Sequence, residues 1–268
     1  MDQPSGAYRF ARAVLRPPMA LLTRRDWRGQ EHVPAHGGVV VATNHLSHAD
    51  PLTFAHYLDD AGRRPRFLAK SEVFQVPVVG SIIKAAGQIP VYRETADAVE
   101  AFRVAVAAVT DGDCVVIYPD GTLTRDPGLW PMAGKTGAAR LGLTTGCPVI
   151  PVAQWGPQQL LAPYHRVPHL VPRPLVHVWA GPPVDLDDLR GQPQTRELLR
   201  VATDRVVGAI VALLEQMRGV SAPARRFDPK DAQVPLTGNP SRPRASGTPG
   251  GGPDPAAATP SRATEESP

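Results

Sequence analysis

A chain of 268 residues, 42% of them hydrophobic, is long enough to bury the core of one large α/β domain or of two small ones. Its formal net charge of +4 suits an anionic partner, such as a membrane surface, a phosphorylated substrate or a nucleic acid, and does not choose among them. Only two cysteines occur, each inside an apolar run, which argues against a disulfide framework and favours a reducing compartment. No stretch reaches the roughly 18 consecutive apolar residues that a membrane-spanning helix needs.

The first 26 residues have a basic amphipathic pattern, which we expect the Pro17-Pro18 pair to break. Such a segment can lie in a membrane interface, or it can be a surface helix that packs on its own domain. It does not resemble a signal peptide, because its apolar stretches are short and interrupted by arginines. The apolar residues that can share one helical face are Tyr8, Phe10, Ala11, Val14 and Leu15.

Strand and helix patterns alternate between residues 27 and 220. The β-branched run in "GGVVVATNH" predicts a buried strand, and a helix is expected to follow in "HADPLTFAHYLDDAG". Further strands are predicted in "RPRFLAKSEVF", "IPVYR", "CVVIYP", "CPVIPVAQW" and "PLVHVWAG", and further helices in "VPVVGSIIKAAGQ", "TADAVEAFRVAVAAVTDG", "GAARLGLTTG" and "TRELLRVATDRVVGAIVALLEQMRG". This alternation predicts a single α/β domain with a mixed, largely parallel sheet flanked by helices.

Residues 221–268 have a different composition from the rest of the chain. Pro, Gly, Ser and Ala dominate this stretch, and large apolar residues are almost absent. Such a segment cannot bury enough apolar surface to offset the entropy lost on ordering. We therefore expect a disordered tail, and we expect the domain to keep its activity without it.

Polar side chains gather at three predicted strand ends: "TNHLSHAD", "YRE" and "YPDGTLTRD". In an open α/β sheet, residues at the carboxyl ends of strands tend to line the site. In the first stretch, Asp50 can accept a hydrogen bond from one nitrogen of His45, which leaves the other nitrogen free to take a proton. The same residues can instead be helix-capping groups. Ser47 lies in no G-x-S-x-G elbow, so a nucleophile would have to come from the substrate.

A metal site is a weaker alternative for the first cluster. His45, His48, Asp50 and His56 offer nitrogen and oxygen ligands, but no Cys pair, H-E-x-x-H motif or acidic cluster accompanies them. The remaining histidines in the second half of the chain have no acidic residue nearby in sequence, and we interpret them as structural: His165, His169 and His177.

The third strand end has the composition of a phosphate site. A glycine-containing turn with a nearby cation can cradle a phosphate through its backbone amides. The candidates are Gly121, Thr122, Thr124, Arg125 and Lys135, with Arg93 at the end of "IPVYR" as a second cation.

Taken in order, these stretches resemble the blocks of the glycerolipid acyltransferase family, which includes the bacterial 1-acylglycerol-3-phosphate acyltransferases. "NHLSHAD" matches the N-H-x-x-x-x-D block, and "GQIPVYR" is similar to the second block. "YPDGTLTR" resembles the F-P-E-G-T-R block, and "CPVIPVAQWG" the apolar fourth block. The resemblance runs from about Trp27 to Pro183.

The resemblance implies an acyltransferase domain over residues 27–220, with residues 1–26 at the membrane interface. It implies that His45 is the general base on the free hydroxyl of lysophosphatidic acid, that Asp50 orients its imidazole, and that acyl-CoA donates the acyl group. Acyl-CoA is then a co-substrate, no cofactor or metal is needed, and the partner is the cytoplasmic face of a membrane rather than a nucleic acid. The acceptor phosphate is expected to contact Arg93, Asp120, Gly121, Thr122, Arg125 and Lys135, and amides near His45 to stabilise the oxyanion.

Two residues depart from the family's third block. Asp120 stands where the block has Glu, and Leu123 stands where it has Arg. Arg125 can supply the cation instead, so an acyltransferase with another lysophospholipid or glycolipid acceptor remains an alternative. A hydrolytic or metal-dependent enzyme, or a lipid-binding module, is the alternative outside this class.

Overall fold

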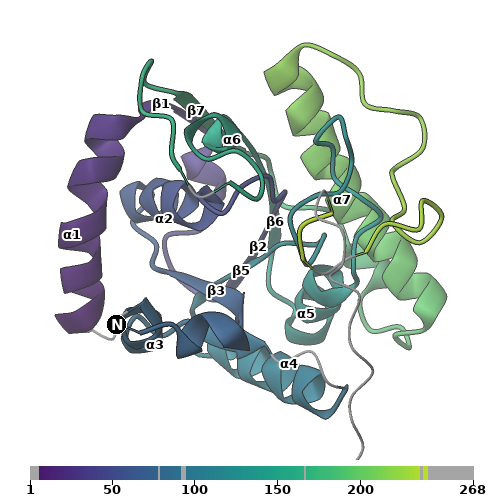
Figure 1. Ribbon diagram of the computed structural model, residues 1–268. Helices are drawn as coiled ribbons and strands as arrows, with labels where there is room; N and C mark the ends of the chain where they lie inside the picture. The colour runs from purple at the N-terminus through teal and green to yellow at the C-terminus, as the bar shows by residue number, and fades with distance from the viewer. Residues whose placement is uncertain (1–5, 78, 92–94, 166, 236–237, 241–268) are drawn as a thin grey trace, which may run out of the picture.

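The fold is a seven-stranded sheet covered by helices on both faces (Figure 1). The structure is a computed structural model that describes residues 6–77, 79–91, 95–165, 167–235 and 238–240. The strands are β1 (Arg24–Arg28), β2 (Val39–Thr43), β3 (Pro65–Lys70), β4 (Ile89–Val91), β5 (Cys114–Ile117), β6 (Val149–Trp155) and β7 (Leu175–Ala180). Their order in the sheet is β1-β7-β6-β2-β5-β3-β4, and every pairing is parallel except that of β6 with β7. The predicted mixed, largely parallel α/β sheet is confirmed.

Two apolar layers explain why β2 reads as a continuous β-branched run. Val40 and Ala42 face the core layer that contains α4, α5 and α7, while Val39 and Val41 face the layer that contains α2. Because helices cover both faces, both sides of the strand are apolar.

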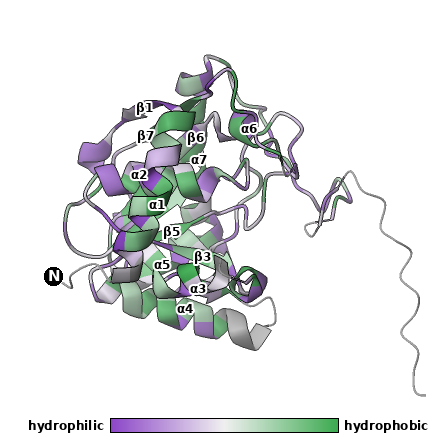
Figure 2. Ribbon diagram, turned by 60° about the vertical axis from the view of Figure 1, so that its left-hand side comes forward, coloured by the Kyte–Doolittle hydropathy of each residue, from purple (hydrophilic) through white to green (hydrophobic). Residues whose placement is uncertain are grey.

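The main helices are α1 (Gly6–Leu22), α2 (Asp50–Asp60), α3 (Val79–Ala85), α4 (Thr95–Thr110), α5 (Gly137–Thr145) and α7 (Arg196–Arg218), with a short α6 (Pro157–Leu160) and 3-10 turns at Gln30–His32, Ser71–Gln75 and Asp187–Leu189. Figure 2 shows hydrophobic and hydrophilic residues interleaved along α4, as expected of a helix with one buried face.

Helix α1 differs from the sequence prediction, because it continues through Pro17 and Pro18. Its contacts with the domain hold it in place: α1 packs against α2 and α3, and Arg12 and Arg16 form ion pairs with Asp59 on α2 at 2.7 and 3.2 Å. The helix is followed directly by β1, which begins at Arg24, so the last residues of the predicted interface segment belong to the sheet. In the part of the chain that the structure describes, every helix is too short or too polar to cross a membrane.

The first part of the predicted tail packs on the domain. The Ala133 amide donates to the Phe227 carbonyl at 3.1 Å, and Arg226 forms an ion pair with Asp204 of α7 at 2.7 Å. Further along, Arg125 donates to the carbonyl of Gly238 at 3.0 Å. Composition alone does not capture these contacts, because they use backbone groups and charges rather than large apolar side chains. Residues 241–268 lie outside the described residues.

Candidate active site

The site is built where β2, β5 and β6 end beside one another. All three strands run parallel, so the residues that follow them meet at one edge of the sheet. His45 follows β2, and the loop after β5 reaches it directly, because the Thr124 amide donates to the His45 carbonyl at 2.8 Å. On the other side, Asn44 and Gln154 join β2 to β6 through three hydrogen bonds of 2.8 to 3.0 Å. The chain before His45 is therefore fixed from both sides.

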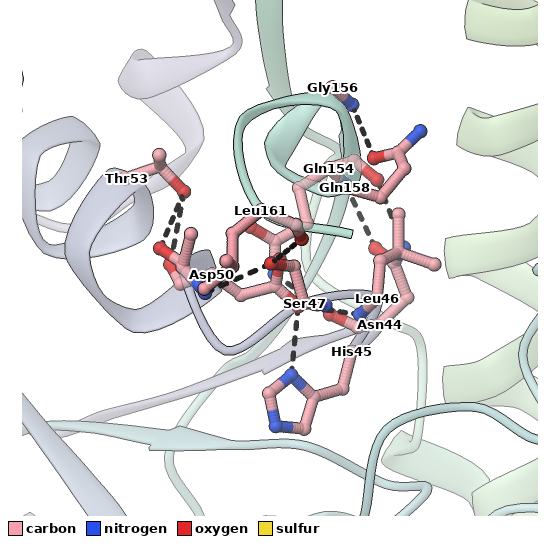
Figure 3. Close-up of polar contacts among 11 residues, drawn as sticks. Asn44, His45, Leu46, Ser47, Asp50, Thr53, Gln154, Gly156, Gln158 and Leu161 are labelled. Atoms are coloured by element: carbon pink, nitrogen blue, oxygen red, sulfur yellow. Dashed lines mark hydrogen bonds and ion pairs between the residues drawn. The ribbon is translucent and has the colours of Figure 1, made fainter. Parts of the chain in front are cut away.

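The His45–Asp50 pair is closed by a short turn (Figure 3). Nδ1 of His45 lies 2.8 Å from Oδ2 of Asp50. The same carboxylate oxygen accepts the backbone amides of Leu46 and Ser47, at 2.5 and 2.9 Å. Asp50 is completely buried, whereas the side chain of His45 keeps 17% of its surface exposed. The expected hydrogen bond between the two residues is present.

This geometry decides which nitrogen of His45 can act as a base. An ionised carboxylate only accepts hydrogen bonds, so Nδ1 carries the proton and Nε2 presents its lone pair. Asp50 is the first residue of α2, where the partial positive charge of the helix end stabilises a carboxylate. Helix capping does not account for the pair, because the amides that Asp50 accepts belong to the preceding turn rather than to the helix.

The turn corrects the expectation for the oxyanion. Amides near His45 were expected to face the substrate, but those of Leu46 and Ser47 donate to Asp50. A polar turn that buries a carboxylate must satisfy it locally, and the nearest amides do so. These two backbone amides therefore hold the Asp50 carboxylate in place.

Among the described residues, the other histidines of the first cluster form no hydrogen bond with Asp50. His48 is exposed and lies edge-on to Tyr164, with ring centroids 6.1 Å apart. His56 is buried against Trp27, 4.8 Å between centroids. Among the described residues, no three His, Cys, Asp or Glu side chains are grouped as metal ligands would be.

Both cysteines are buried and free. Burial raises the pKa of Cys114 to about 12 and also raises that of Cys147. Since the thiolate is the nucleophilic form, neither residue has the setting of a reactive cysteine.

The predicted phosphate-site residues fall into two groups. Gly121 and Lys135 are exposed, and they are adjacent: the Lys135 amide donates to the Pro119 carbonyl at 2.8 Å, and a Cβ on Gly121 would approach Lys135 Nζ to 2.7 Å. Thr122 is half-buried between them and the core. This group presents a cation and a tight turn at the surface.

The second group points into the protein. Asp120 is buried, its Oδ1 accepts the Met132 amide at 2.9 Å, and burial raises its pKa to about 7. Thr124 donates to the Trp130 carbonyl at 2.6 Å. Arg125 is buried too and donates to the Tyr164 hydroxyl and to Gly238. Arg93 lies outside the described residues.

Sequence reasoning missed a second His–Asp pair. Asp26 of β1 and His177 of β7 face each other across the parallel strands, and His177 Nδ1 lies 2.7 Å from Asp26 Oδ2. Burial would raise the pKa of Asp26, but hydrogen bonds from Arg28, His177 and Trp179 lower it. The two residues are 151 positions apart, so no local pattern connects them. This pair lies at the far edge of the sheet from β4.

An apolar cavity of about 170 Å³ lies between α1, α2 and α3. Pro51 and Leu52 of the first turn of α2 line it, and Phe67 of β3 bounds it on the sheet side. The residues that give it its apolar character are Ala11, Leu15, Met19, Leu52, Ala55, Phe67, Ile82, Ile83 and Ala86.

A His–Asp dyad at the carboxyl edge of an α/β sheet suits an enzyme that activates a hydroxyl group of its substrate. Residues 24–155, which carry the dyad and six of the seven strands, match the family model described as Acyltransferase. Residues 24–155 therefore form a domain of the glycerolipid acyltransferase family.

Its relatives within that family share one description. It is 28% identical over 153 residues to the 1-acyl-sn-glycerol-3-phosphate acyltransferase of Bacillus subtilis, an alignment that covers 56% of this chain and 72% of the relative. It is 29% identical over 140 residues to the chloroplast enzyme of that name from Brassica napus, but there the match spans 52% of this chain and only 39% of the relative. The crystal structure of the 1-acyl-sn-glycerophosphate acyltransferase of Thermotoga maritima has the same fold, with a TM-score of 0.59, 22% identity, and coverage of 81% of this chain and 80% of that one.

Proposed function

We propose that the protein transfers a fatty acyl group from acyl-CoA to the free hydroxyl of 1-acyl-sn-glycerol-3-phosphate, that is, lysophosphatidic acid. The observation that carries the proposal is the His45 Nδ1–Asp50 Oδ2 hydrogen bond of 2.8 Å, which leaves Nε2 as a base at the end of β2. The names of the relatives support this acceptor.

In the proposed reaction His45 moves one proton. Its Nε2 takes the proton of the acceptor hydroxyl as the oxygen attacks the thioester carbonyl, and Asp50 stabilises the imidazolium. The tetrahedral intermediate then expels the thiolate of CoA, which takes the proton from Nε2. One C–O bond forms and one C–S bond breaks, and no acyl-enzyme, cofactor or metal is required.

The exposed turn at Gly121 with Lys135 is the proposed contact for the acceptor phosphate. An ammonium group beside a glycine turn offers charge and backbone amides together. Buried hydrogen bonds support this turn. Asp120 accepts the Met132 amide, and Arg125 donates to the Tyr164 hydroxyl and to the Gly238 carbonyl. Arg93 remains a proposed second contact.

The apolar parts of the substrates need an apolar route. The cavity between α1, α2 and α3 is the proposed place for hydrocarbon, because its surface is almost entirely apolar and Pro51 and Leu52, the residues that follow Asp50 in α2, line it. On the outside of α1, Phe10, Val14 and Leu21 are 62, 51 and 71% exposed, and their spacing places them on one stripe. Together with the arginines, this stripe supports peripheral attachment to the cytoplasmic face of a membrane.

The experiment is thiol release from a long-chain acyl-CoA by the purified protein, with and without lysophosphatidic acid. Release is expected to require the acceptor and to fall about 1,000-fold in His45→Ala. His48→Ala, which removes an exposed imidazole three residues away, is the control and should keep its activity. Release without any acceptor would indicate a hydrolase, and full activity in His45→Ala would overturn the general-base role.

A second acceptor is favoured by one observation. Leu123 stands where the resembling family block has Arg, and it is 97% buried, so this position packs instead of binding an anion. A different lysophospholipid or glycolipid head group is therefore the second candidate. A panel of such acceptors in the same assay, ranked by kcat/KM, distinguishes the two.

A further inference from the structure

The side chain of Tyr118 lies directly against His45. Their rings stack with centroids 4.1 Å apart and planes inclined by 23°. On its other side, Tyr118 stacks on Phe67 at 6.3 Å and 11°, and Phe67 contacts Phe54 of α2. The imidazole is thus held from two directions, by Asp50 at Nδ1 and by an aromatic face that is itself backed by the core.

The hydroxyl end of Tyr118 reaches the buried side of the dyad. The ring is partly exposed, but the hydroxyl is buried, close to the Asp50 carboxylate and the Gln154 side chain. Burial and the charge of Asp50 hold the pKa of Tyr118 well above its ordinary value, so the hydroxyl keeps its proton. An interaction of the hydroxyl with the Gln154 side chain opposes this rise without cancelling it. The hydroxyl therefore belongs to the buried polar group around Gln154, and it is the ring that meets the imidazole.

This arrangement matters because His45 changes charge during the proposed reaction. The face of an aromatic ring attracts a cation, so the stack stabilises the imidazolium more than the neutral imidazole. The stack also restricts rotation of the imidazole out of line with Asp50. Both effects act when the proton moves, and neither requires contact with substrate.

We propose that Tyr118 is a positioning residue that acts through His45: its ring keeps Nδ1 on Asp50 and stabilises the imidazolium. The inference rests on the proposed proton-transfer function. The ring carries the larger part of the effect, because it is the ring that touches the imidazole.

The test compares Tyr118→Phe with Tyr118→Leu. The Phe variant keeps the stack and is expected to retain kcat within about threefold, whereas the Leu variant is expected to lose about tenfold in kcat with KM for both substrates unchanged. The control is Phe102→Leu, which removes a partly buried aromatic ring that packs on the other core layer, away from the Tyr118 stack. It should lower the melting temperature as Tyr118→Leu does and leave kcat per folded molecule unchanged.

A second readout does not depend on turnover. The 15N chemical shifts of His45 report which ring nitrogen carries the proton, and Tyr118→Leu is expected to lower the share of the Nδ1–H tautomer while Phe102→Leu does not. Equal kcat in Tyr118→Leu and the wild type, with His45→Ala inactive, would overturn the positioning role alone. Full activity in His45→Ala would instead overturn the proposed function. If Tyr118→Leu does not fold, Tyr118→Met, which also lacks the ring, takes its place: about tenfold lower kcat and a smaller share of the Nδ1–H tautomer support the proposal, and wild-type values of both contradict it.

Discussion

The turn from His45 to Asp50 and the loop from Pro119 to Lys135 both follow parallel strands, yet they are stabilised in different ways. In the turn, the Asp50 carboxylate takes all of its hydrogen bonds from residues three to five positions away. In the loop, Arg125 depends on Tyr164 and on Gly238, 39 and 113 positions away. The hydrogen bonds of the Asp50 carboxylate are thus self-contained, although Thr124 and Tyr118 also contact His45, while the loop is shaped by distant parts of the chain. We therefore expect mutations to separate the proposed proton transfer from the proposed acceptor binding.

The strongest test of the self-contained dyad is Asp50→Asn. The amide oxygen can still accept Nδ1–H and the two backbone amides, but the charge opposite the imidazolium is lost. We expect kcat to fall on the order of 100-fold or more with the fold intact, measured by acceptor-dependent thiol release and circular dichroism. Asp26→Asn makes the same change in the second His–Asp pair and should leave kcat unchanged. Equal losses in the two variants would mean that the charge of Asp50 has no special role.

The exposed part of the loop is tested by Lys135→Ala. Loss of the ammonium beside Gly121 should raise KM for lysophosphatidic acid about tenfold, close to 1.4 kcal/mol, with kcat nearly unchanged. Lys84→Ala removes an exposed lysine from α3 and is the matched control. If kcat falls while KM stays constant, the loop acts on the dyad, which contradicts the separate roles of the two regions.

Two truncations test how far the loop depends on the C-terminal segment. A chain that ends after Pro240 keeps the Phe227, Arg226 and Gly238 contacts, and its melting temperature should stay within about 1 °C of the full chain. A chain that ends after Gly219 loses them, and it should melt about 5 °C lower, with a severalfold higher KM for the acceptor. Identical behaviour of the two chains would show that residues 220–240 are dispensable, as composition alone predicts.

The smallest effect on activity is expected at the buried Asp120, where the predicted change is in stability. Its pKa is raised from 3.8 to about 7, so the unfolded chain ionises at lower pH than the folded protein does. The stability that the protonated carboxyl contributes is present below about pH 4 and is lost as the pH rises to about 7. Asp120→Asn should therefore be more stable than the wild type at pH 8, by up to about 4 kcal/mol for a shift of about three pKa units, with no such gain at pH 4, as measured by urea unfolding. A gain of equal size at both pH values would contradict the raised pKa.

The sheet and the dyad were predictable because their signals are local. A β-branched run buried on both faces marks β2, and a spacing of five residues places Asp50 under His45. Tyr118 carries a weaker signal, since an aromatic residue at the end of a strand is common in any core. The Asn44–Gln154 bonds and the Asp26–His177 pair have no signal, because they join strands that are more than 100 residues apart in sequence.

Helix α1 shows where a strong local signal gives the wrong prediction. Two consecutive prolines predict a break, yet the helix continues, because ion pairs to Asp59 and packing on α2 and α3 offset the missing backbone hydrogen bonds. Propensity states what a segment prefers in isolation. The domain surface that receives α1 is assembled from residues 50–85, which a local pattern does not include.

The two outer strands bear on a property unrelated to catalysis. An open sheet exposes unpaired backbone groups along its edge strands, and these can recruit strands from other molecules. Here β4 pairs over only three residues, and β1 has the sequence Arg-Arg-Asp-Trp-Arg. A short edge and a strongly cationic edge both resist strand addition, since a second copy would bring like charges together. The sheet is therefore protected against aggregation at both of its ends, even where many copies of the protein are crowded together.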